Sequence, residues 1–234
     1  ITEVDLRLSS RRKLKRHVEI INLSDFAART SQRIDEGYLY GDLQFKTDGT
    51  AEDFLQRGVY SFYIPVSLDT PIPQKQRKIS SDKWKELLAL AHSDKAQVFE
   101  DYTNYYLSTN GQLYWTDTHQ LGYYDENYEE YLKKTLPDYK TGSLMISEVY
   151  VPREKIYDFM TALSLSNEKQ QLEIIYGTIR LIETDTETFL PWAKQDYACI
   201  VLNLRVEHSL LGLEKARSDF KLLIDAALNY GGSY

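Results

Sequence analysis

The chain has 234 residues, 42% of them hydrophobic, which is enough for a sizeable core in one large domain or two small ones. Its formal net charge of −7 argues against a nucleic-acid partner, because phosphate binding needs a basic face, and its dense basic run at 11–16 is short. No apolar stretch approaches the roughly 20 residues of a membrane span, and the charged start does not resemble a signal peptide.

The first third of the chain predicts the order strand, helix, strand, strand, helix. Residues 2–8 already alternate as a strand, so we expect the chain to open in mid-structure as part of a longer protein. After the basic run, interpreted as a solvated strand end or linker, the predicted strands are 18–23, 39–46 and 59–66. Ser24 is the expected N-cap of the first helix and Ser81 that of the second. Gly37 is placed to close the first helix in the left-handed conformation.

In the strand at 39–46, Asp42 and Gln44 alternate with Leu43 and Phe45 and therefore point to the opposite face. The middle of the chain adds a helix from Asp94 to near residue 109, then a strand or extended segment at 112–120. A short helix is expected around 127–134, within an acidic, tyrosine-rich stretch.

The last third predicts the same order again, with strands at 143–151, 174–182 and 197–207. A helix follows Pro152, which is tolerated in a first turn, and another spans 212–229. Residues 233–234 look like the start of a further strand. We expect an α+β fold of two ferredoxin-like βαββα halves that form a helix-covered antiparallel sheet, with pseudo-repeats at about 17–93 and 143–229 and an insertion at 94–142.

Two strands of the last third carry an unusual polar face. In the strand at 197–207, Ala198 and every second residue after it form a core face, while the opposite face carries Asn203 and Arg205. In the strand at 174–182, Arg180 lies on the same side as Ile174 and Tyr176. Burying such polar groups without partners costs free energy, so the pattern indicates a lined site or a contact with another domain.

Two further residues are candidates for chemistry, although the chain has no Gly-rich phosphate loop, GxSxG or HExxH signature. Glu148 alternates with apolar residues, and Arg180 is its natural partner, either in a structural ion pair or in a site. His119 lies in an aromatic, polar segment and is either a hydrogen-bonded loop histidine or a proton acceptor or substrate ligand. The single cysteine, Cys199, excludes an internal disulfide and fits a reducing, cytoplasmic location.

Several segments together carry a family resemblance. They are YWTDTHQ at 114–120, SEVYVPR at 147–153, YGTIRLIE at 176–183, FLPWA at 189–193, YACIVLNLRVEH at 197–208 and the terminal LIDAALNYGGSY. The chain resembles, over nearly its whole length, the substrate-binding (cap) domain of FAD-linked oxidoreductases of the vanillyl-alcohol oxidase / p-cresol methylhydroxylase superfamily. Its pattern is similar to that of the aldonolactone and alditol oxidase branch.

This resemblance implies a domain organisation. Residues 1–16 would be the end of a preceding FAD-binding domain and its linker, residues 17–234 the cap domain, and a C-terminal segment would be missing. The FAD would be bound mainly by the preceding domain, which would be a partner together with a small-molecule substrate. Covalent attachment of the flavin at Cys199 or His119 stays open.

The resemblance also implies an activity: oxidation of a hydroxy acid, sugar lactone or polyol by hydride transfer to flavin, with the fragment alone inactive. The candidate catalytic residues are Glu148, Arg180 and His119, and the candidate substrate-binding residues are Tyr176, Asn203, Arg205, Tyr150 and Gln120; no metal site is predicted. The alternative is a non-catalytic α+β interaction module in which the polar residues are structural.

Overall fold

The computed structural model describes residues 10–117 and 128–234. The predicted strand at 2–8 and the candidate residues His119 and Gln120 lie outside these ranges. The strands are β1 (Lys13–Asn22), β2 (Tyr40–Phe45), β3 (Arg57–Val66), β4 (Leu113–Trp115), β5 (Gly142–Pro152), β6 (Ile174–Ile182) and β7 (Tyr197–Glu207). The helices are α1 (Leu23–Asp35), α2 (Ser81–Ser93), α3 (Lys95–Ser108), α4 (Tyr128–Thr135), α5 (Ile156–Gln170) and α6 (Leu210–Asn229), with a 3-10 turn at Arg153–Lys155.

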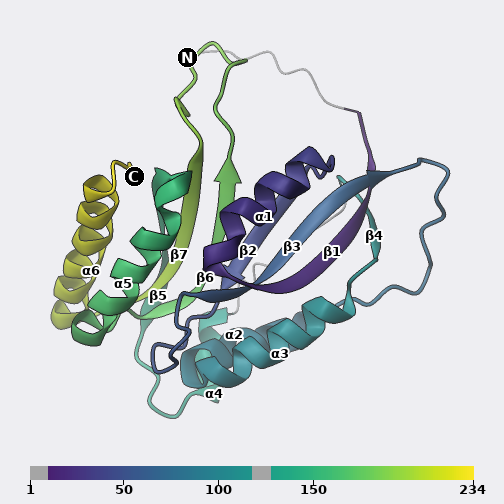
Figure 1. The fold of residues 1–234 in the computed structure, drawn as a ribbon. Helices are drawn as coiled ribbons and strands as arrows, with labels where there is room; N and C mark the ends of the chain where they lie inside the picture. Colours follow the sequence, from purple (N-terminus) through teal and green to yellow (C-terminus); the bar gives the residue numbers. More distant parts are fainter. Residues whose placement is uncertain (1–9, 118–127) are drawn as a thin grey trace.

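The described strands form one seven-stranded antiparallel sheet in the order β4-β1-β3-β2-β6-β7-β5 (Figure 1). The predicted βαββα order is confirmed in both halves, as β1-α1-β2-β3-α2 and β5-α5-β6-β7-α6. The halves meet where β2 pairs with β6 through Leu43–Ile179 and Gln44–Thr178. At the outer edge of β5, Tyr150 and Ser233 exchange two backbone hydrogen bonds of 2.8 Å. This antiparallel bridge agrees with the strand predicted to start at 233.

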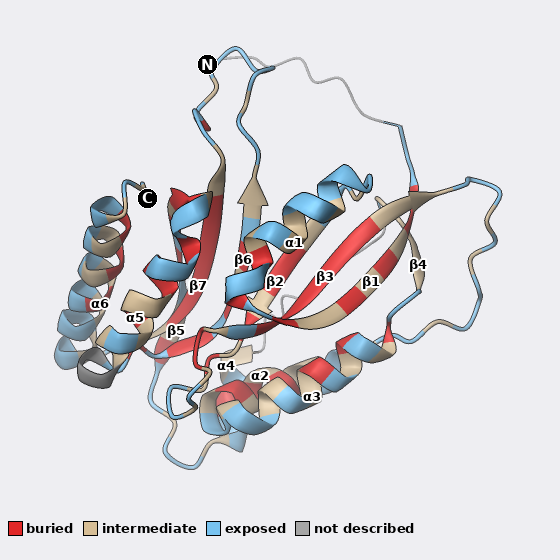
Figure 2. Ribbon diagram, in the orientation of Figure 1, coloured by how far each residue is buried: buried red, intermediate tan, exposed pale blue. Residues whose placement is uncertain are grey.

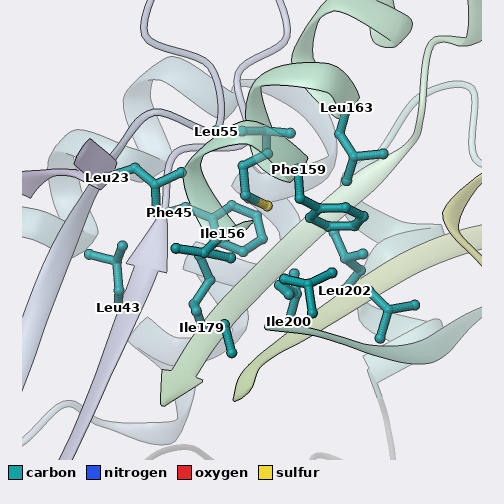
Figure 3. Close-up of a cluster of buried hydrophobic side chains, with 14 of the residues drawn as sticks. Leu23, Leu43, Phe45, Leu55, Ile156, Phe159, Leu163, Ile179, Ile200 and Leu202 are labelled. Carbon is teal, nitrogen blue, oxygen red and sulfur yellow. The ribbon is translucent and has the colours of Figure 1, made fainter. Parts of the chain in front are cut away.

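Helices cover both faces of the sheet. Adjacent residues of a strand point to opposite faces, and on β3 Tyr60 packs into the large core while Val59 packs with Tyr106 of α3. The large core lies under α1, α5 and α6, and it takes side chains from both halves, including Phe45, Phe159 and Leu202 (Figure 3). Buried residues therefore run as continuous bands along β3 and β7 (Figure 2).

Helix starts follow local capping chemistry. Asp94, where this helix was predicted to begin, caps α3 by accepting a hydrogen bond from the backbone N–H of Gln97 at 2.9 Å. The prediction for α2 was wrong by one residue, because the cap is Ser80, which accepts from the N–H of Lys83 at 3.1 Å. The predicted cap at Ser24 was also wrong. The chain passes directly from β1 into α1 at Asn22, whose side chain makes no capping bond.

The basic run at 11–16 was predicted to be a solvated strand end or linker, and this was wrong. Lys13 and Arg16 belong to β1 and are buried, so the sheet begins before the predicted domain boundary at 16. The guanidinium of Arg16 donates hydrogen bonds of 2.9 Å to the hydroxyls of Tyr63 and Thr109 and lies 4.8 Å from the ring centroid of Tyr114. Hydroxyls and aromatic faces can thus replace water around a buried cation.

Two other strand predictions needed correction. Within the described part of the segment predicted as a strand or extended at 112–120, which ends at residue 117, the strand covers Leu113–Trp115. In β6 a register shift between Ile174 and Tyr176 places Ile174 in the large core, not on the polar face with Tyr176. A β-bulge of this kind adds a residue to one strand, so simple alternation fails on one side of it.

Candidate functional site

The face of the sheet opposite the large core carries the candidate residues in cross-strand rows. In antiparallel pairs, residues directly opposite each other point to the same face. Arg180 of β6 pairs with Cys199 of β7, which pairs with Tyr150 of β5. Extending the β2–β6 register by one residue places Asp42 across from Arg180. We call Asp42, Arg180, Cys199 and Tyr150, together with Glu148, the polar row.

Glu148 and Arg180 share this face, but they do not form the predicted ion pair. Glu148 pairs with Val201, which lies two residues along β7 from Cys199, the partner of Arg180. The Glu148 side chain is exposed, not buried as its apolar neighbours suggested, and it accepts a hydrogen bond of 2.9 Å from the Tyr150 hydroxyl. Burial and this hydrogen bond raise the pKa of Tyr150, which therefore stays a hydrogen-bond donor at neutral pH.

Arg180 presents its charge to solvent. Its side chain is exposed and makes no hydrogen bond or ion pair with the part of the chain that the structure describes. Its positive charge acts on two row neighbours, because it opposes the rise in the pKa of both the Asp42 carboxyl and the Cys199 thiol. An exposed guanidinium in the middle of a sheet face can donate to a carboxylate or to several oxygens at once.

Asp42 belongs to the polar row but was not among the predicted catalytic or substrate-binding residues. It is buried, with 6% of its surface exposed, and it accepts a hydrogen bond of 3.4 Å from the Gln44 amide. Burial raises the pKa of Asp42, while the charge of Arg180 and the hydrogen bond from Gln44 act in the opposite direction. A carboxylate buried in this way needs a nearby positive charge.

The other end of the face is covered, and the predicted substrate-binding residue Arg205 is used there by the protein itself. Its guanidinium donates a hydrogen bond to the carbonyl of Lys140 and lies 5.0 Å from the ring centroid of Tyr139. Asn203, next along β7 on this face, is 3% exposed, while Tyr176 on β6 is 40% exposed. Of the predicted substrate-binding residues, Tyr176 and Tyr150 border the open area.

His92 of α2 helps to close this covered end, since its ring Nε2 is hydrogen-bonded to the hydroxyl of Tyr128 on α4. Burial, together with the positive charges of Arg205 and Lys95, lowers the pKa of His92 to about 4. Histidine in the unfolded chain has a pKa of about 6.5. Between about pH 4 and pH 6.5 the unfolded chain therefore binds more protons than the folded chain does.

We expect the free energy of unfolding to fall as the pH is lowered from about 6.5 to about 4, by up to about 1.4 kcal/mol per pH unit from this histidine. His92→Gln should remove that contribution, which urea titrations of both proteins at several pH values would measure. Parallel stability profiles for the two proteins would contradict the assignment.

An aromatic wall borders the polar row at its open end. Trp192, in the loop between β6 and β7, packs edge-on against Tyr150 with ring centroids 4.8 Å apart and stacks on Tyr197 at 5.7 Å. Asp185 accepts hydrogen bonds of 3.0 Å from the N–H groups of Glu187 and Thr188, which folds the loop onto itself. The loop thus places an indole beside Tyr150, whose hydroxyl donates a hydrogen bond to Glu148.

Cys199, in the centre of the row, is 5% exposed. Burial and then the negative charge of Glu148 raise the pKa of its thiol to about 11. Among the described residues, no group of three or more His, Cys, Asp or Glu side chains is arranged to hold a metal ion. None of the described helices has both the length and the apolar character needed to cross a membrane.

The fold and the site define an α+β domain with an open, partly charged sheet face. No family model matches the chain, and no curated protein matches it. It is similar to a solved structure described as alkyldihydroxyacetonephosphate synthase, with 10% sequence identity, a TM-score of 0.43, and coverage of 94% of this chain and 40% of that one. The chain therefore spans about two fifths of the length of that structure.

Proposed function

We propose that this chain is the substrate-binding cap domain of an FAD-dependent oxidoreductase that oxidises a hydroxy acid, sugar lactone or polyol. The observation that carries the proposal is the polar row. Neighbouring strands bring an exposed guanidinium, a carboxylate and a phenol to one open face, and this face would lie over the flavin. His119, outside the described residues, remains a proposed proton acceptor.

The groups on this face fit the polar edge of a flavin and a bound substrate. Thr178 Oγ1, next to Arg180 on this face of β6, is buried without a hydrogen-bond partner in the described part of the chain. Buried polar groups are normally satisfied, so an unpaired hydroxyl beside an open face supports its completion by a ligand or another domain. When bound, FAD would supply the acceptor for the hydride that leaves the substrate carbon.

The residues of the chain would divide the remaining work. Arg180 would bind a substrate carboxylate or an oxygen that gains negative charge during the reaction. Glu148, oriented by its hydrogen bond from Tyr150, would bind the reacting hydroxyl. Trp192 would exclude water on the side of the aromatic wall. These roles require another domain to face the row, and the preceding FAD-binding domain is the proposed partner.

The test is the absorption spectrum of protein purified from the complete reading frame. We expect flavin bands near about 370 and 450 nm that bleach when a hydroxy acid, aldonolactone or polyol is added without oxygen. A colourless protein that also fails to bind added FAD would overturn the proposal and favour a non-catalytic interaction module.

A further inference from the structure

The polar row contains a charge pair that extends the proposed function, on which this inference rests. We propose that Asp42 is a positioning residue that acts as the buried counter-charge of Arg180, so that the two together set how strongly the site binds an anionic group of the substrate. The argument comes from the register, the burial of the two side chains and the charges around them.

The register brings the pair together across the junction of the two halves. Leu43–Ile179 and Gln44–Thr178 are opposed in the antiparallel β2–β6 pairing, and the next step opposes Asp42 and Arg180 on the same face. Asp42 is 6% exposed and Arg180 is exposed, so the carboxylate lies beneath the site while the guanidinium lies at its surface. The two side chains influence each other without a direct ion pair.

Of the groups around Asp42, Arg180 is the charged one that lies at the surface, where a ligand can change its environment. Arg16 of β1 also bears on Asp42, but that guanidinium is enclosed by hydroxyls and aromatic rings. Among the described residues, Asp42 also acts on phenols whose own pKa values are raised and which are neutral below pH 8: Tyr60 and Tyr63 of β3, and Tyr102 and Tyr106 of α3. An ionised Asp42 therefore has two positive groups acting on it, Arg180 at the surface and Arg16 in the interior.

At a pH above the titration midpoint of Asp42, where its carboxyl is ionised, Asp42→Asn removes a negative charge and should leave the positive charge of Arg180 less compensated. An anion at the surface would then bind more strongly, by about two- to fivefold, the fold-change that an exposed charge pair is worth. The same change should alter the environment of the Arg180 guanidinium itself. Both effects can be observed without a flavin.

The experiment records side-chain arginine ¹H–¹⁵N NMR spectra of this chain while glycolate, a small hydroxy acid, is added. The signal that is missing from the spectrum of Arg180→Met belongs to Arg180. The response to glycolate should be lost in this variant. Asp42→Asn should shift that signal and tighten glycolate binding about two- to fivefold, and it should change nothing further in the Arg180→Met background. The matched control is Asp219→Asn on α6, which alters an equally buried carboxylate, 6% exposed and paired with Lys215 at 2.6 Å.

The inference would be overturned if the Arg180 signal moved no more in Asp42→Asn than in Asp219→Asn. It would also be overturned if Asp42→Asn changed glycolate binding by the same factor in the Arg180→Met background. If Asp42→Asn does not fold, the reciprocal measurement decides. In Arg180→Met the ¹³Cγ titration midpoint of Asp42 should rise, and an unchanged midpoint would refute the pair. A colourless complete protein, by contrast, would overturn the proposed oxidoreductase function while leaving these results in place.

Discussion

Arg180→Met in the intact protein is expected to lower kcat/KM about 100-fold, the loss typical for removal of one charge-stabilising donor. The melting temperature should hardly change, because the Arg180 side chain is exposed and makes no hydrogen bond or ion pair within the described chain. Steady-state kinetics and thermal melting of the same preparations would measure the two effects.

The control for this variant is Arg217→Met on α6, which removes an arginine from the opposite side of the sheet and should leave kcat/KM unchanged. Arg180→Lys should restore only part of the activity, because an ammonium cannot donate two parallel hydrogen bonds as a guanidinium does. A loss of folding in proportion to the loss of activity would instead identify Arg180 as a structural residue.

Phe159→Ala is expected to destabilise the chain by about 3–5 kcal/mol, the usual cost of deleting a large buried ring. Phe159 lies on α5 with 0% of its surface exposed, among core residues such as Leu163 and Leu202 (Figure 3). Tyr157, two residues earlier and 46% exposed, provides the matched control, because Tyr157→Ala should cost under about 1 kcal/mol. Urea unfolding followed by fluorescence would measure both.

The same titration tests whether the two halves fold as one unit. The large core includes Phe26 and Phe45 from the first half and Phe159 and Leu223 from the second. Because neither half has this core to itself, we expect one cooperative transition, shifted as a whole by Phe159→Ala. Two separate transitions, only one of them shifted, would show that the halves are independent.

Much of the fold was predictable because alternation and turn chemistry are local signals. Gly37, for example, ends α1 with a positive φ of 90°, as its position after the helical run required. The errors arose where tertiary packing decides. Arg16 became part of β1 because tyrosines distant in sequence enclose it, and the Ile174 bulge depends on pairing with β7.

Alternation predicts which face of its strand a site residue occupies, but it does not predict which residue of the neighbouring strand lies opposite. Alternation correctly placed Arg180 and Tyr176 on one face of β6, whereas the register shows that Glu148 shares that side of the sheet. Which residues stand opposite each other depends on the register, which no local pattern specifies. The ion pair expected between Glu148 and Arg180 is therefore absent, while Asp42, already recognised on the polar side of its strand, proved to be the neighbour of Arg180.

The buried thiol at the centre of the row makes the chain convenient for labelling. Cys199 is the sole cysteine, and with a thiol pKa of about 11 only about one molecule in ten thousand carries the reactive thiolate at pH 7. Cysteines introduced at exposed positions of the two halves would therefore react with maleimide dyes or spin labels, while Cys199 would stay unlabelled. Distances across the β2–β6 junction become measurable in an otherwise unmodified protein.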